Sequence, residues 1–186
     1  MKTRNIFIFF LMASLPLLIN SSCKEIKDAA AVTVSYDLPK INFTYYRATD
    51  KATEVLLYSG MVQINLDSLL NVHGLSSGVV GSTYLTQFTL TIDDPDNATF
   101  SWLESSRVQF AQDAGFQTAV EVASAVNSDP NAKVLSLTTN NVNIRPYLGN
   151  TAFYMRVFAT MNGPLPWEWV GMYINSQLKL TLEPLN

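Results

Sequence analysis

Two tryptophans late in the chain are separated by a single residue, and such aromatic side chains could bind a ligand if they are exposed. Trp167 and Trp169 follow Pro164 and Pro166 at the start of a segment with strand character. In an extended segment, residues two apart face the same side, so the two indoles would form one platform. A flat indole suits the apolar face of a sugar ring. The alternative is that at least one of them closes the end of the core, the role we expect for Trp102.

An acidic cluster offers a second kind of chemistry. It consists of Asp93, Asp94, Asp96 and Asn97. Hard oxygen ligands on a loop suit Ca²⁺, although this spacing does not fit an EF-hand. Asp, Asn and Pro also favour turns, so a turn without metal is the alternative. Together with Glu104, these carboxylates suggest a remote third reading, a glycoside hydrolase, which needs two carboxyl groups across a sugar.

The chain has one histidine, so every histidine-dependent mechanism would have to use His73. We expect it to cap the C-terminal end of a short helix beside Gly74, where a histidine can satisfy the last carbonyl groups. A serine triad would need an orienting carboxylate and a nucleophile elbow, and no G-x-S-x-G motif is present. The sequence therefore predicts no catalytic residue, and we expect a protein that is not an enzyme.

Composition narrows the function classes further. The 186 residues are 48% hydrophobic and 15% charged, with one cysteine and a formal net charge of −3. The apolar fraction is too high for a disordered chain. A single cysteine excludes a disulfide scaffold and a cysteine-rich zinc site. An acidic chain is repelled by phosphate backbones, so we expect no nucleic-acid partner.

Period-2 alternation of apolar and polar residues is the main structural signal, and these elements must position any site. Nine such runs occur, at 32–38, 41–45, 62–66, 87–92, 108–110, 120–122, 135–137, 153–157 and 177–182. A strand with one apolar face needs a second layer to cover it. The pattern predicts an all-β fold, an antiparallel two-sheet β-sandwich of immunoglobulin-like or jelly-roll type, over residues 31–186.

One short helix is expected over residues 67–73, with Asp67 as its N-cap. A second short turn is expected at Arg145–Gly149, where a proline removes a ladder donor. The triplet Asp67-Ser68-Leu69 also resembles the O-glycosylation acceptor used in the envelope of some bacteria, which implies Ser68 as a candidate acceptor.

The first 22 residues have the features of an export signal. Lys2 and Arg4 precede an apolar run from Ile6 to Ile19, which is too short to span a bilayer as a helix. Residues 18–23, Leu-Ile-Asn-Ser-Ser-Cys, resemble a bacterial lipobox, which implies cleavage before Cys23 and lipidation of its thiol. We expect no transmembrane helix, a signal peptide over 1–22 and a lipidated tether over 23–30.

The segment Lys24–Asp28 resembles the short charged signals that send Bacteroidetes-type lipoproteins to the outer face of the outer membrane. The alternative is a solvated tether on the periplasmic leaflet. Further on, Thr89–Ile92, Phe100–Val108 and Ile144–Leu148 resemble a pattern of uncharacterised Bacteroidetes-type cell-surface lipoproteins with one sandwich domain. That resemblance implies a fold and a location and carries over no catalytic residue.

These observations favour a lipid-anchored binding module of the cell envelope that recognises a glycan or a protein through strand-end loops. Trp167 and Trp169 are its candidate stacking residues, and calcium is the only cofactor considered. The alternative is a structural or assembly subunit of an envelope complex that pairs with a partner through an edge strand. An enzyme acting on envelope polysaccharide is the remote alternative.

Overall fold

The chain folds as a two-layer β-sandwich. The computed structural model describes residues 32–47, 54–72, 80–149 and 151–182. The elements are β1 (Val32–Asp37), β2 (Ile41–Tyr46), β3 (Glu54–Gln63), α2 (Leu66–Val72), β4 (Val80–Asp94), η2 (Phe100–Trp102), β5 (Leu103–Ala111), β6 (Val120–Val126), β7 (Val134–Ser136), β8 (Thr138–Thr139), η3 (Arg145–Tyr147), β9 (Ala152–Met161) and β10 (Trp169–Leu182). The predicted all-β sandwich with a short helix is confirmed.

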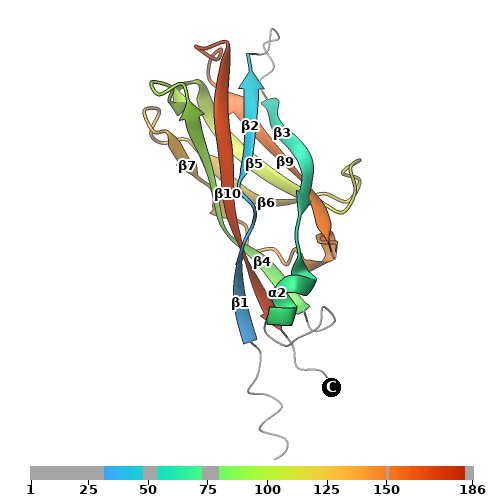
Figure 1. The fold of residues 1–186 in the computed structure, drawn as a ribbon. Helices are drawn as coiled ribbons and strands as arrows, with labels where there is room; N and C mark the ends of the chain where they lie inside the picture. The colour runs from blue at the N-terminus through green and yellow to red at the C-terminus, as the bar shows by residue number, and fades with distance from the viewer. Residues whose placement is uncertain (1–31, 48–53, 73–79, 150, 183–186) are drawn as a thin grey trace, which may run out of the picture.

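Each layer is an antiparallel sheet of five strands (Figure 1). In the first, called sheet A, β10 lies between β4 and the pair β1 and β2, and β7 lies beyond β4. In the second, called sheet B, the order is β3-β9-β5-β6-β8. Strands far apart in the sequence are therefore neighbours. β10 pairs with β1 and β2 on one side and with β4 on the other.

The core forms between the inner faces of the two sheets, as the alternation of buried and exposed residues along β9 and β10 shows. Phe110 and Phe153 pack with ring centroids 4.5 Å apart. Trp102 is 1% exposed and stacks on Tyr45 with ring centroids 6.0 Å apart, so its expected place in the core is confirmed. Period-2 alternation predicted these positions because it follows from the pleat of the strand itself.

The helix begins one residue earlier than expected, and its N-cap is a different residue. The Ser68 backbone N–H donates to the Asn65 side-chain oxygen over 2.9 Å, so Asn65 caps α2, and the prediction of Asp67 as the cap is wrong. Asp67 lies in the first turn instead, where a carboxylate favours the positive end of the helix dipole. The predicted turn near Arg145–Gly149 is present as η3.

Several sequence-based expectations fall on residues that the structure leaves undescribed. Cys23, His73, the predicted signal peptide and the predicted tether lie outside the described residues. Within the described part of the chain, no helix has the length and apolar character needed to cross a membrane.

Candidate functional site

The structure separates the two tryptophans that were expected to form one platform. Trp169 is 38% exposed, whereas Trp167 is half-buried and packs against the core. The reason is that β10 begins only at Trp169. Trp167 lies before the strand, where the rule that residues two apart share a face does not hold. A platform made of both indoles is therefore not what this fold presents.

Tyr46, rather than Trp167, is the aromatic residue that lies beside Trp169. It is 68% exposed and lies directly opposite Trp169 in the antiparallel pair of β2 and β10. Their chain neighbours Tyr45 and Val170 are buried, so both exposed rings stand on the outer face of sheet A.

The backbone pattern brings these two rings close together. The N–H of Arg47 donates to the carbonyl of Glu168 over 2.8 Å, which makes the next pair, Tyr46 and Trp169, a non-hydrogen-bonded pair. Side chains are closer in such pairs, with Cβ atoms about 4.5–5.5 Å apart.

The next row of the same face supplies polar groups on either side of a glycine. Gly171 lies between Thr44 on β2 and Asp94 on β4. A Cβ on Gly171 would lie 3.4 Å from the Cβ of Asp94, so the Asp94 side chain rises on the same face. Because Gly171 has no side chain, none stands on β10 between the Thr44 hydroxyl and the Asp94 carboxylate. We call Thr44, Tyr46, Asp94, Trp169 and Gly171 the distal aromatic patch.

Contacts beneath and beside the patch hold its strands in place. The Arg47 side chain donates from Nε to the Trp167 carbonyl over 3.1 Å, across 120 residues of sequence. On the inner side, Tyr45 stacks on Trp102, and burial raises the pKa of the Tyr45 hydroxyl. At the other border, Lys40 Nζ lies 3.5 Å from the ring centroid of Tyr173 and covers that ring. These contacts hold the two strands that carry the patch, and the patch ends at Tyr173 because Lys40 covers that ring.

The acidic cluster forms the turn that follows β4. Asp93 and Asp94 are the last residues of β4, and the Ala98 N–H donates to the Pro95 carbonyl over 2.8 Å to close the turn. Asp96 and Asn97 are exposed on it. No group of three or more His, Cys, Asp or Glu side chains suited to a metal ion occurs among the described residues. The calcium site stays a prediction, and Asp94 is the member of the cluster that faces the patch.

A trough with a volume of about 410 Å³ lies on the outer face of sheet B. Arg107 donates from Nε and Nη2 to the two carboxylate oxygens of Glu54, each over 2.8 Å. This bidentate hydrogen bonding lowers the pKa of Glu54. Glu121 lines the same trough. A glycosidase acid needs a raised pKa, so Glu54 is held in the opposite state.

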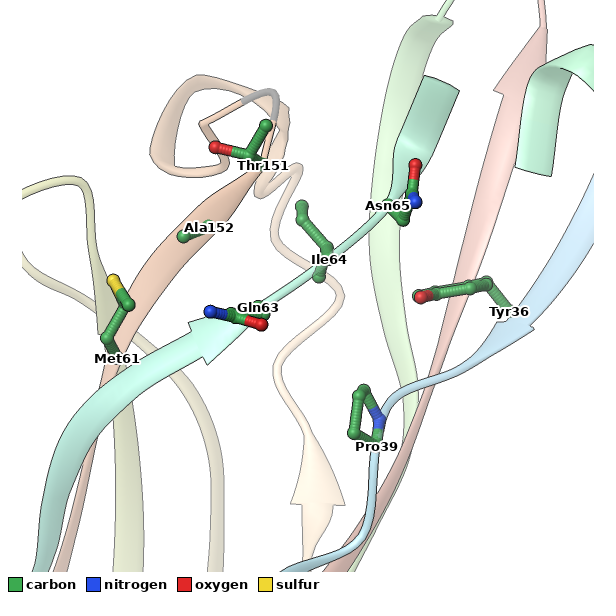
Figure 2. A pocket seen from close by; sticks show the side chains of 8 residues that line it. All are labelled: Tyr36, Pro39, Met61, Gln63, Ile64, Asn65, Thr151 and Ala152. Atoms are coloured by element: carbon green, nitrogen blue, oxygen red, sulfur yellow. The ribbon is translucent and has the colours of Figure 1, made fainter. Parts of the chain in front are cut away.

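A second hollow, the side pocket, has a volume of about 560 Å³ and opens between the edges of the two sheets (Figure 2). It is lined by Tyr36, Pro39, Met61, Gln63, Ile64, Asn65, Thr151 and Ala152. None of these side chains carries a formal charge, and the Asn65 amide also caps α2. No local pattern in the sequence indicates this pocket, because its walls come from three separate segments.

Ser68, the candidate glycosylation acceptor, is exposed on α2. Glycosylation of Ser68 stays a prediction. Cys23 and His73 lie outside the described residues, so the structure does not bear on lipidation or on the expected helix cap.

No family model and no curated protein matches the chain. Among solved structures, it is similar to one of Desmodium yellow mottle tymovirus, with 13% identity over 84% of this chain and 91% of that chain and a TM-score of 0.27. It is also similar to the BFDV capsid protein in the crystal structure of a 60-mer, with 10% identity over 84% of this chain and 97% of that chain and a TM-score of 0.31. At these values the similarity carries no conclusion about function.

Proposed function

We propose that the protein is a lipid-anchored binding module of the cell envelope that recognises a glycan through the distal aromatic patch. The observation that carries the proposal is the cross-strand pairing of Tyr46 with Trp169, both exposed, on the outer face of sheet A. Large exposed aromatic side chains placed side by side on a rigid sheet are the usual mark of a binding surface rather than of a solvated one.

The chemistry of the patch suits a sugar. The two rings offer flat apolar surfaces for the C–H face of a pyranose ring. Beside them, the Thr44 hydroxyl and the Asp94 carboxylate offer hydrogen-bonding groups on either side of Gly171. Asp94 accepts hydrogen bonds only, which suits a sugar hydroxyl as the donor. The missing side chain at Gly171 leaves room for a substituent of the ring.

The place of the patch in the fold fits a tethered module. Val32, the first described residue, pairs with Leu182 at one end of β10, and Tyr46 pairs with Trp169 at its other end. Figure 1 shows β1 and the end of β2 at opposite ends of the sandwich. Along a strand of this length the two ends lie roughly 40 Å apart. A lipid on Cys23 would place the patch on the side away from the membrane.

The anchor and the location are parts of the proposal with their own test. The lipobox-like sequence before Cys23 and the charged segment after it support an outer-membrane lipoprotein that faces the outside. Stable anchoring needs more than one acyl chain, which a bacterial lipoprotein carries. Cys23→Ala should release the protein from the membrane fraction, and protease added to intact cells should digest the wild type. A Cys23→Ala variant that stays in the membrane fraction contradicts the anchor.

Glycan binding is tested with the full chain purified in detergent from the envelope. A glycan array identifies the best binder, and titration calorimetry then compares the wild type with Trp169→Ala and Tyr46→Ala. Each substitution should weaken binding at least about tenfold. The matched control is Tyr154→Ala, which removes a half-buried aromatic side chain from the outer face of sheet B and should leave the affinity unchanged.

Two results would contradict the proposal. One is an array on which the wild type binds no glycan more strongly than the Trp169→Ala, Tyr46→Ala double variant. The other is a glycan whose affinity falls equally in the sheet B control and in the patch variants, because a general loss of folding would then explain the effect.

A further inference from the structure

One strand of the sandwich has a long edge along which no other described strand pairs. β3 lies at the edge of sheet B and is ten residues long, and among the described strands only β9 pairs with it. The other edge strands are shorter: six residues each in β1 and β2, three in β7 and two in β8. Proteins commonly blunt sheet edges with short strands, prolines or charges. In β3, the only charged residue is Glu54 at its start, and there is no proline.

The backbone of β3 shows which groups point away from its partner. The Ile64 N–H donates to the Thr151 carbonyl over 2.8 Å, so Ile64 faces the β9 side. Successive residues in a strand direct their N–H and C=O groups to opposite sides. Gln63 and Met61 therefore direct both groups to the free edge. The register is regular from Tyr58 to Gln63 and is shifted only between Leu56 and Tyr58.

The side pocket lies along this part of the edge. Met61 and Gln63 line it from β3, and Thr151 and Ala152 line it from the start of β9. Tyr36 of β1 and Pro39, which follows β1, line it from sheet A (Figure 2). The free hydrogen-bonding groups of β3 thus border a hollow with a second wall. All of its lining side chains are uncharged, although several have hydroxyl or amide groups. Such a slot suits the backbone of a chain and disfavours charged side chains.

We infer that this slot binds an extended, uncharged segment of a partner protein, which adds to β3 as a further strand. Backbone hydrogen bonds to Met61 and Gln63 would supply affinity, and alternate small or apolar side chains of the segment would enter the pocket. A second copy of this chain fits less well. Its β3 would bring the paired strand β9 with it, and Tyr36 and Pro39 close the slot on the side where that strand would have to lie.

The inference is tested with the full chain and a displayed library of ten-residue peptides. The enriched peptides should lack charges over at least four consecutive residues and carry apolar residues at alternate positions. The best of them is then synthesised in two forms, with N-methyl groups on alternate residues in one register or in the other. One form should lose binding at least tenfold, and the other should bind within about threefold of the parent peptide, because only alternate N–H groups face β3.

A variant of the far wall gives a second measurement that leaves the β3 backbone untouched. Pro39→Lys should weaken the peptide at least tenfold by placing an ammonium group at the uncharged slot, and Pro39→Ala should bind it within about threefold of the wild type. The inference is overturned if no peptide binds more tightly than about 1 mM. It is also overturned if both N-methylated forms bind like the parent, or if Pro39→Lys has no effect.

A concentration-dependent dimer that Met61→Lys dissociates would assign the edge to a second copy instead, and would also overturn the inference. The test is independent of the glycan proposal, because the Trp169→Ala variant should bind the peptide as tightly as the wild type does.

Discussion

The outer faces of the two sheets both carry aromatic rings, but the surroundings of these rings differ. On the side of sheet B, guanidinium groups lie over two rings: the Cζ–centroid distances are 4.1 Å for Arg107 over Phe158 of β9 and 3.9 Å for Arg156 over Phe116 of the β5–β6 connection. On sheet A, Tyr46 and Trp169 are 68% and 38% exposed, and among the described residues no such cation lies over either ring. The rings of sheet B serve the fold, whereas those of the distal aromatic patch are available to a ligand.

This difference separates exposed aromatic residues that stabilise a sheet from those that bind. An arginine over a phenylalanine contributes about 0.5–1 kcal/mol at an exposed site and occupies the surface that a ligand would need. Tyr173 marks the border within sheet A itself, because Lys40 covers its ring. If the comparison holds, substitutions on the two faces should affect different properties: affinity on sheet A and stability on sheet B.

The largest expected effect belongs to Trp169→Ala. The affinity for the array-selected glycan should fall at least about tenfold, or 1.4 kcal/mol, because the indole is one of the two exposed rings on which the sugar would stack. The free energy of unfolding should fall by less than the roughly 3–5 kcal/mol that removal of a core tryptophan costs, because the residue is 38% exposed. Titration calorimetry and urea unfolding measure the two quantities. An unchanged affinity together with a large loss of stability would make Trp169 structural.

Phe158→Ala should show the reverse pattern. Removal of the ring takes away the surface on which Arg107 lies, and the free energy of unfolding should fall by about 1 kcal/mol. The affinity for the glycan should stay within error of the wild type. Phe158→Leu is the control that keeps apolar volume and removes only the aromatic face. The comparison fails if Phe158→Ala weakens glycan binding as much as Trp169→Ala does.

A smaller effect is expected from Gly171→Ala. The added Cβ would lie 3.4 Å from the Asp94 Cβ, an ordinary contact, so the fold should be kept. The methyl group would stand between Thr44 and Asp94, where a substituent of the sugar would lie, and should weaken glycan binding about threefold. Calorimetry on this variant tests whether the open position at Gly171 is part of the site. Equal or tighter binding would remove Gly171 from the patch.

The smallest effect belongs to the ion pair of Glu54 with Arg107. Glu54→Gln should lower the free energy of unfolding by about 0.5 kcal/mol at neutral pH, since the pair is exposed. Hydrogen bonding to Arg107 lowers the pKa of Glu54 in the folded state. The stabilisation is therefore present above the ordinary carboxylate pKa and is lost as the pH falls through the lowered one. Urea unfolding of both proteins across the acid range checks this. A difference that grows on acidification would contradict it.

Much of the fold could be predicted from the sequence, because burial on one face of a strand leaves a period of two. Each of the nine alternating runs overlaps a strand, and the strand that was missed, β8, has two residues and is too short to show a period. Boundaries were less certain. Asn65 and Asp67 are both residue types favoured at an N-cap, so the local sequence does not distinguish them, and in the structure Asn65 takes the position.

The candidate site could be predicted only in part. Trp169 was found as an aromatic residue at the start of a strand, but its neighbour Tyr46 depends on the pairing of β2 with β10, which no local pattern encodes. The same holds for Gly171 beside Asp94, and for the side pocket between β3 and the β1–β2 junction. Period-2 patterns report which residues face inward; they do not report which strands are neighbours.

The most direct test uses the three indole N–H groups of the chain as separate reporters. In a ¹H–¹⁵N spectrum, each tryptophan gives one indole signal, and Trp169→Phe assigns the signal of Trp169. On addition of the array-selected glycan, the Trp169 signal should shift in a saturable way, while that of the buried Trp102 should stay in place. Saturable binding that leaves the Trp169 signal unmoved would contradict the account.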